Sequence, residues 1–280
     1  MRSVVTFTCP DGPGIVYALT GAIVQAGGNI TESQQYSSPD TGGFFMRIEV
    51  EHPTERADLD RVLAPVAERF HGRMISDDAG RLVRTLVLAS RTPYCVDALL
   101  SHARAGSLPI EVPLVMANHD ELASLAAFYG VAFESHEVSG PDGRAVFEAR
   151  LREVVDSLSI ELIVLARYMQ ILSPQLCEDF AGRLINIHHS FLPGFKGADP
   201  YTQAHARGVK LIGATAHFVT ADLDEGPIIG QRVVPVTHAR TPQQMREIGR
   251  DIEGITLVHA VKLWAEHRIL LDGIRTVVFD

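Results

Sequence analysis

An asparagine and a histidine two positions apart are the first candidates for chemistry in this sequence. Asn186 and His188 lie in an alternating apolar segment that runs into a Pro-Gly loop, a pattern typical of a strand followed by a loop. The two-residue period of a strand places both side chains on one face, with Ile185 and Ile187 directed toward the core. An amide donor and a titratable imidazole are therefore predicted together at a strand end, where open α/β sheets build their sites.

Asp224 adds a carboxylate from a second segment. It stands in the turn-rich sequence Asp-Glu-Gly-Pro, directly before an apolar run at 228–230 that is typical of another strand. If the two strand ends are neighbours, the amide, the imidazole and the carboxylate converge on one small group. The alternative is a structural histidine, whose ring only completes the hydrogen bonding around a strand end.

Strands that alternate with helices must position these residues. Such an alternation from residue 82 onward predicts a mostly parallel, Rossmann-like sheet covered on both faces. We therefore expect a second domain at residues 81–280. Its predicted strands are 82–89, 110–117, 131–134, 162–166, 211–218 and 228–236, and its predicted helices are 96–105, 120–129, 144–158 and 241–266.

The first part of the chain predicts a smaller α/β domain at residues 1–80. The order strand, helix, strand, strand, helix, strand is the βαββαβ arrangement of ferredoxin-like folds. Turn residues and apolar periodicity give its boundaries. The predicted strands are 3–9, 30–36, 44–50 and 73–75, and the predicted helices are 15–25 and 55–70.

Composition excludes several classes of protein. The net charge of -9 argues against a nucleic-acid surface, which normally carries a basic excess. No apolar run approaches the roughly 20 residues that a membrane span needs, and the first residues do not resemble a secretory signal. Cys9, Cys95 and Cys177 are far apart and form no metal or disulfide spacing, which suits a reducing compartment. We expect a cytoplasmic protein with no nucleic-acid or membrane partner.

Two short motifs in the first domain resemble those of ACT domains, which are small ligand-sensing modules. The loop 11–15 matches their Asp-x-x-Gly-Ile sequence, and Asn29-Ile30 matches the start of their second strand. A Gly-rich loop before a helix presents free backbone N–H groups to a carboxylate. The resemblance implies a homo-oligomer and a ligand site; a purely structural or oligomerising role remains the alternative. The candidate ligand residues are Asp11, Gly12, Gly14, Asn29 and Ile30.

The second domain resembles folate-dependent formyltransferases over its whole length. The strings at 186–193, 213–218 and 222–229 carry this resemblance, and the family uses an Asn, a His and an Asp at the positions of Asn186, His188 and Asp224. With the ACT-like first domain, the chain is similar to the formyltetrahydrofolate deformylase family. This implies hydrolysis of 10-formyltetrahydrofolate to formate and tetrahydrofolate, without metal or cofactor, to balance the one-carbon folate pool and supply formate for purine biosynthesis.

Each of the three residues has an expected role in this reaction. Asn186 would donate its amide N–H to the developing oxyanion, and His188 would carry the proton between water and the leaving nitrogen. Asp224 would either hold the imidazole or order the water.

The pterin ring of the substrate needs a site as well. The sequence 167–174 resembles the family's Met-Arg-Ile-Leu loop, with Gln170 where Arg is usual. The alternative for this loop is simple packing against the core. By the resemblance, the substrate-binding residues are Met169, Gln170 and Leu172 on one wall, and Val219, Thr220, Ala221 and Asp222 on the other.

Three alternatives remain open from the sequence. A formyltransferase would pass the formyl group to an amine such as glycinamide ribonucleotide; its relatives bind a phosphate with a Gly-rich loop, whereas the loop 89–95 contains no Gly and includes Pro93. A metal-dependent hydrolase would use His188, His189 and His217, although neighbouring residues of a strand face opposite ways. A non-catalytic sensor would bind only an amino acid, and glycine and methionine are the candidate effectors of the first domain.

Overall fold

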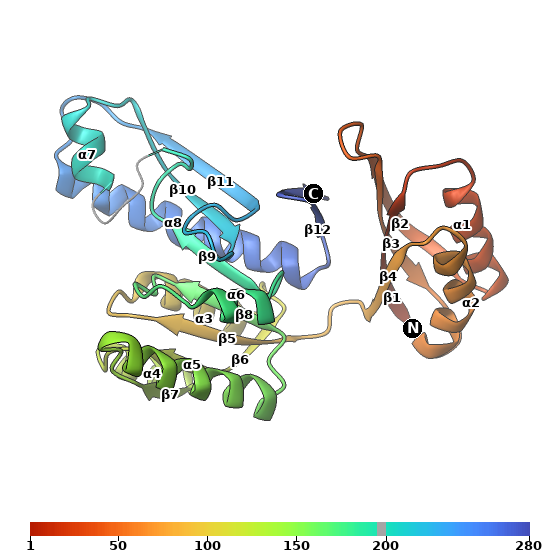
Figure 1. Cartoon of the computed structure of the whole chain (residues 1–280), viewed down its shortest axis with the longest axis horizontal. Coiled ribbons are helices and arrows are strands. Elements are labelled where there is room, and N and C mark those ends of the chain that lie inside the picture. Colours follow the sequence, from red (N-terminus) through yellow and green to blue (C-terminus); the bar gives the residue numbers. More distant parts are fainter. Residues whose placement is uncertain (195–199) are drawn as a thin grey trace. The chain divides into compact units, whose positions relative to one another are not determined.

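The computed structural model describes residues 1–194 and 200–280 and divides the chain into two compact units (Figure 1). The first unit consists of Met1–Arg81 and Glu266–Asp280, and the second of Leu82–Ala265. The sequence prediction kept residues 81–280 together, whereas the structure groups the last fifteen of them with the first unit. Among the described residues, every helix is too short or too polar to cross a lipid bilayer.

The first unit has the predicted βαββαβ order. Its four strands form an antiparallel sheet in the order β2-β3-β1-β4, and α1 and α2 pack on one face of it. Alternate residues of β3, such as Met46 and Ile48, point into this core, as the two-residue period of a strand requires. The elements are β1 (Arg2–Pro10), α1 (Ile15–Gln25), β2 (Asn29–Ser37), β3 (Gly43–Glu51), α2 (Arg56–Arg69) and β4 (Arg73–Asp78).

A C-terminal hairpin completes the first unit. The strands β12 (Ile269–Asp272) and β13 (Arg275–Val278) pair with each other. The buried Leu270 of β12 and Phe279, which follows β13, cluster with Phe45. Phe45 lies between core residues of β3, so it faces away from the helices and the hairpin covers this second face. Burial of each apolar side chain contributes about 1.5–3 kcal/mol, which explains why the segment joins the first unit.

Charged side chains of the first sheet bind the segment that leads into the hairpin. The Arg47 guanidinium is 2.7 Å from a Glu49 oxygen and 3.1 Å from a Glu32 oxygen, and its Nε donates to the carbonyl oxygen of Glu266 at 3.1 Å. Asp77 accepts hydrogen bonds from Arg81 at 2.5 Å and from His267 at 2.9 Å. Burial would raise the pKa of Asp77, but these two partners hold it well below its ordinary value.

The second unit is built on a seven-stranded sheet in the order β11-β10-β9-β8-β5-β6-β7. Strands β5 to β9 run parallel, and β10 pairs antiparallel with both β9 and β11, so the predicted α/β class with a mostly parallel sheet is confirmed. The strands are β5 (Val83–Ala89), β6 (Ile110–Ala117), β7 (Ala132–Ser135), β8 (Leu162–Ala166), β9 (Leu184–His188), β10 (Leu211–Phe218) and β11 (Ile228–Pro235).

Helices cover this sheet on both faces. The face that carries Leu86 and Leu88 packs against α5 and α6, and the long blue helix α8 contacts β9, β10, β11 and α3 (Figure 1). The short helices α6 and α7 were not predicted. The helices are α3 (Tyr94–Arg104), α4 (Ala123–Tyr129), α5 (Gly140–Ser157), α6 (Pro174–Asp179), α7 (Pro200–Ala206) and α8 (Pro242–Ala265).

Candidate active site

The strand β9 carries the first two candidate residues to the carboxyl edge of the parallel strands. Asn186 lies opposite Leu165 of the parallel strand β8 and opposite His217 of the antiparallel strand β10. His188 is the last residue of β9 and pairs with Thr215. The predicted strand and its register therefore place the amide and the imidazole at the end of the sheet where sites form.

Asp224 reaches the same place by a loop that folds back. Asp224 lies between β10, which ends at Phe218, and β11, which begins at Ile228. Because β10 separates β11 from β9 in the sheet, the two strand ends are not adjacent. The loop returns because the Phe218 N–H donates to the Pro227 carbonyl oxygen at 2.9 Å. A Cβ atom at Gly226 would overlap the carbonyl oxygen of Phe218, so this approach requires glycine. Asp224 itself has a φ of +57°, in the left-handed region.

The two ring nitrogens of His188 have different surroundings. Its Nδ1 is 3.2 Å from an oxygen of Asp224. Its Nε2 is buried and finds no hydrogen-bond partner within residues 1–194 and 200–280. A carboxylate at Nδ1 assigns the proton of a neutral imidazole to that nitrogen, which leaves the lone pair on Nε2. The geometry therefore presents a base on the open side of the ring.

His217 orients the Asn186 amide, a role that the sequence did not reveal. Its Nδ1 donates to the carbonyl oxygen of Phe218 at 2.8 Å, and its Nε2 is 3.2 Å from Asn186 Nδ2. Burial lowers the pKa of His217 despite the Phe218 carbonyl and the nearby Asp224 carboxylate. A neutral ring with its proton on Nδ1 accepts one Asn186 N–H and leaves the other amide proton for a ligand.

The Asp224 carboxylate stays ionised in this environment. Burial alone would raise its pKa, but the hydrogen bond from His188, supported by the nearby His217 ring, holds the pKa of Asp224 below its ordinary value. His217 Nε2 lies 3.8 Å from the same carboxylate oxygen. An anion therefore faces two imidazoles and stabilises positive charge on either ring.

A cavity of about 310 Å³ joins these residues to the predicted pterin site. We call it the His188 cavity. Met169 in its wall is half exposed, and its backbone N–H donates to the buried Ser90 hydroxyl at 3.0 Å. Every candidate from the sequence in this unit lines the cavity: Asn186, His188 and Asp224, then Met169, Gln170 and Leu172, then Val219, Thr220, Ala221 and Asp222.

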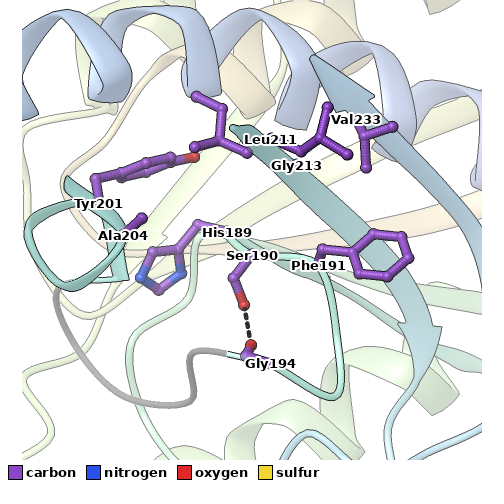
Figure 2. Close-up of a pocket in the computed structure, with 10 residues that line it drawn as sticks. His189, Ser190, Phe191, Gly194, Tyr201, Ala204, Leu211, Gly213 and Val233 are labelled. Atoms are coloured by element: carbon purple, nitrogen blue, oxygen red, sulfur yellow. Dashed lines mark hydrogen bonds between the residues drawn. The ribbon is translucent and has the colours of Figure 1, made fainter. Parts of the chain in front are cut away.

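A second cavity of about 330 Å³ lies on the other side of His189, which lines both. Its walls are mainly apolar. Figure 2 shows His189, Tyr201 and Ala204 on one side of this space, with Phe191 and Val233 on the other. The Ser190 hydroxyl donates to the Gly194 carbonyl oxygen at 2.9 Å. Among the described residues, no group of three or more His, Cys, Asp or Glu is arranged to hold a metal ion.

The candidate ligand residues of the first unit do not form one group within a single copy. Asp11, Gly12 and Gly14 lie between β1 and α1, where the Asp11 N–H donates to the Gly42 carbonyl oxygen at 2.7 Å. Asn29 and Ile30 begin β2 and pair with the last residues of β3, at the opposite end of the sheet. The nine-residue strand β3 separates the loop at 11–14 from Asn29 and Ile30. A ligand site made from both motifs would therefore have to combine the loop of one copy with Asn29 and Ile30 of another.

Comparisons with known proteins cover nearly the whole chain. A formyl transferase family model matches residues 83–261, and an ACT domain model matches residues 3–68. The chain is 43% identical to a formyltetrahydrofolate deformylase from Corynebacterium sp. (strain P-1), over 99% of this chain and 98% of the relative. It is 40% identical to one from Bacillus subtilis (strain 168), over 98% and 92%.

Solved structures give the same result. A formyltetrahydrofolate deformylase from Burkholderia mallei matches with a TM-score of 0.95 and 44% identity, over 100% of this chain and 99% of that one. A glycinamide ribonucleotide transformylase from Symbiobacterium toebii matches with a TM-score of 0.66 and 33% identity, over 71% of this chain and 95% of that one.

Proposed function

The chain belongs to the formyltetrahydrofolate deformylases, a family of hydrolases, and on this premise we propose that the His188 cavity binds 10-formyltetrahydrofolate and hydrolyses its formyl amide. The observation that carries the proposal is the arrangement of His188. Its Nδ1 is held by Asp224, while its Nε2 lies in the cavity wall without a partner among the residues that the structure describes.

The reaction begins with a proton transfer to His188. Nε2 removes a proton from water as the water oxygen attacks the formyl carbon. The free N–H of Asn186 donates to the formyl oxygen, which becomes an oxyanion. Asp224, at 3.2 Å from Nδ1, stabilises the imidazolium and keeps the ring in place. This distance favours the role of holding the imidazole over that of ordering the water.

The second step breaks the C–N bond. His188 returns its proton to the leaving nitrogen of the folate, and the bond between that nitrogen and the formyl carbon opens. The products are tetrahydrofolate and formic acid, which passes its remaining proton to solvent and becomes formate. The formyl oxygen carries a full negative charge only in the tetrahedral intermediate, so the Asn186 hydrogen bond is strongest there, as catalysis requires.

The folate would lie between the two walls of the cavity. The loop after β8, with Met169, Gln170 and Leu172, would contact the pterin through its main chain, and Val219 to Asp222 would form the opposite wall. A contact through the backbone tolerates Gln170 in place of the usual Arg. A Gln170→Ala variant with unchanged KM would support the main-chain contact.

Formate release without any acceptor tests the proposal. Purified protein is given 10-formyltetrahydrofolate in the presence of chelator, and both products are followed. We expect turnover that falls about 10²–10⁴-fold in His188→Ala and stays unchanged in His136→Ala, whose ring contacts Glu134 at 3.2 Å outside the cavity. Full hydrolysis by His188→Ala would refute the site, and loss of activity on chelation would favour a metal.

A second candidate function is formyl transfer to an amine. The likeness to the glycinamide ribonucleotide transformylase favours it. Against it, Pro93 and Tyr94 stand where helix α3 begins, and neither offers the close backbone approach of glycine. Folate binding without turnover, followed by turnover on addition of glycinamide ribonucleotide, would establish the transferase.

The first unit would regulate this activity. Its match to ACT domains supports an amino-acid effector, and we propose glycine or methionine, the products at either end of the one-carbon folate pool. Deformylation would then balance that pool and supply formate for purine synthesis. Titrating each amino acid against hydrolysis, with the size of the homo-oligomer measured in parallel, tests the idea; a flat response to both would reject it.

A further inference from the structure

Arg167 lies in the wall of the His188 cavity, and the mechanism above does not use it. It follows directly after β8, and its side chain is 16% exposed. Its φ of +62° lies in the left-handed region, which a residue with a side chain adopts only under strain. The surroundings therefore maintain an unfavourable backbone conformation at the residue that brings a guanidinium to the cavity.

A buried carboxylate holds Arg167 from behind. Glu253 of α8 is 1% exposed, and the Arg167 Nε is 3.6 Å from one of its oxygens. The hydroxyls of Tyr94 and Tyr201 donate to the two Glu253 oxygens at 2.5 and 2.9 Å. A Cβ atom at Gly249 would overlap the Tyr201 hydroxyl, so this packing requires glycine one turn earlier in α8. Burial and the Glu253 charge raise the pKa of both tyrosines, which remain donors.

The guanidinium makes no hydrogen bond within the part of the chain that the structure describes. Its Nε lies 3.6 Å from the Glu253 oxygen that accepts from Tyr94, which is beyond hydrogen-bond distance, and this Nε is buried and unsatisfied. A guanidinium offers five donors, and a buried donor without an acceptor is unfavourable. Such a group in a cavity wall is suited to a ligand that brings oxygen atoms.

The chemistry of hydrolysis supplies such a ligand. Attack by water puts a second oxygen on the formyl carbon, and cleavage of the C–N bond leaves both oxygens on formate. Transfer to an amine would never form this carboxylate. Asn186 accounts for one of the two oxygens, and the planar fork of an arginine matches two oxygens on one carbon.

We propose that Arg167 binds the water-derived oxygen in the tetrahedral intermediate and then holds the formate product. The inference rests on the proposed hydrolysis at His188. Water adds to the formyl carbon, the C–N bond breaks, and the nitrogen takes the proton from His188. The resulting formic acid passes its remaining water-derived proton to solvent, and formate leaves as an anion paired with Arg167. Glu253, Tyr94 and Tyr201 are positioning residues, which fix the guanidinium without occupying its outer nitrogens.

Kinetics of arginine variants test this role. In Arg167→Ala we expect kcat for hydrolysis to fall about 10²–10³-fold, with little change in the KM for the folate. Product inhibition by formate, measured at saturating tetrahydrofolate, should disappear. Added guanidinium chloride at low millimolar concentration should restore part of the activity. The matched control is Arg152→Ala. The Arg152 guanidinium is 2.7 Å from an Asp179 oxygen and does not line the cavity, so this variant should behave as wild type.

Two further variants keep the test decisive if Arg167→Ala fails to fold. Arg167→Lys keeps the charge and loses the fork, so kcat should be intermediate and formate inhibition weaker than in wild type. Glu253→Gln should lower kcat and weaken formate inhibition while leaving the KM for the folate unchanged, a split that loss of fold would not produce.

The outcomes separate this inference from the proposed function. Wild-type kcat and formate inhibition in a folded Arg167→Ala or Arg167→Lys protein would overturn the role of Arg167, and so would a defect in Arg167→Ala that guanidinium leaves untouched. If His188→Ala hydrolyses normally, the proposed site fails whatever Arg167 does. If His188→Ala is inactive and Arg167→Ala is normal, only the present inference fails.

Discussion

Two buried arginines in different regions of the molecule have opposite surroundings. Arg47 crosses the outer face of the sheet in the first unit, and its guanidinium contacts Glu32, Glu49 and the carbonyl oxygen of Glu266. Arg167 stands in the wall of the His188 cavity, 3.6 Å from a Glu253 carboxylate that accepts hydrogen bonds from two tyrosines. The first arginine makes its hydrogen bonds within the fold, and the second makes none among the described residues.

The difference separates structural charge from charge kept for a ligand. A buried ion with all its hydrogen bonds made inside the protein fixes packing, and removing a partner mainly affects stability. A buried polar atom left unsatisfied in a cavity wall favours a bound group. His188 Nε2 and Arg167 Nε are of the second kind, which is why both enter the proposed chemistry.

The largest expected effect comes from removing the charge of Asp224. In Asp224→Asn the Nδ1 proton of His188 is no longer fixed by an anion, so hydrolysis should fall by up to about 10⁴-fold. Steady-state formate release measures it, and thermal unfolding should change little. An active Asp224→Asn enzyme would contradict this interpretation, because the basicity of His188 Nε2 would then not depend on the Asp224 carboxylate at Nδ1.

Removing Arg47 should affect stability and leave chemistry nearly intact. Arg47→Met removes one of the two arginines that pair with the buried Glu49 and leaves Arg2 at 2.7 Å. Breaking a buried ion pair destabilises by about 3–5 kcal/mol, and because Arg2 remains we expect a loss at the lower end of this range, about 3 kcal/mol. Chemical denaturation measures the loss in the first unit. Arg61→Met, at an exposed pair with Asp58, is the matched control and should change little. A stable Arg47→Met protein with weakened hydrolysis would reverse the roles of the two arginines.

The smallest expected effect concerns Asp77 and depends on pH. Its pKa is lower in the folded protein than in the unfolded chain, so it stabilises the fold above about pH 4 and loses this contribution as the pH falls further. Asp77→Asn should cost about 1.5–3 kcal/mol at pH 7, and the gap from wild type should narrow between about pH 4 and pH 2. Denaturation curves at several pH values measure the gap. If the difference in the free energy of unfolding between wild type and Asp77→Asn did not change with pH, Asp77 would stabilise the fold by packing rather than by its charge.

The bounds of a helix or strand could be predicted accurately from the sequence where its apolar residues follow a single helical or strand period. The helix 15–25 and the strands 110–117, 162–166 and 211–218 have the predicted bounds, because apolar spacing and flanking turn residues determine them locally. The strand period likewise placed Asn186 and His188 at one strand end. The approach of Asp224 was different, since it depends on the contact of Gly226 with Phe218, and a returning loop has no periodic signal.

Other parts of the site depend on contacts that residue types do not encode. His217 orients Asn186 through the register between β9 and β10, and the left-handed backbone of Arg167 is unusual for any arginine. The hairpin β12–β13 had a usable signal, the turn Asp272-Gly273 between short apolar runs. Its strands are only four residues long. The sequence alone did not connect them with the first unit, because Phe45, against which they pack, lies more than two hundred residues earlier in the chain.

The hairpin has a consequence for the order in which the protein is made. The second unit is inserted between β4 and β12, so a growing chain completes residues 82–265 before the last strands of the first unit exist. Until then, Phe45 lacks its contacts with Leu270 and Phe279, and Arg47 lacks its hydrogen bond to Glu266. A chain that ends before β12 would thus contain the complete His188 cavity while its first unit still lacks the hairpin, so that residues 266–280 decide when the ACT unit is complete.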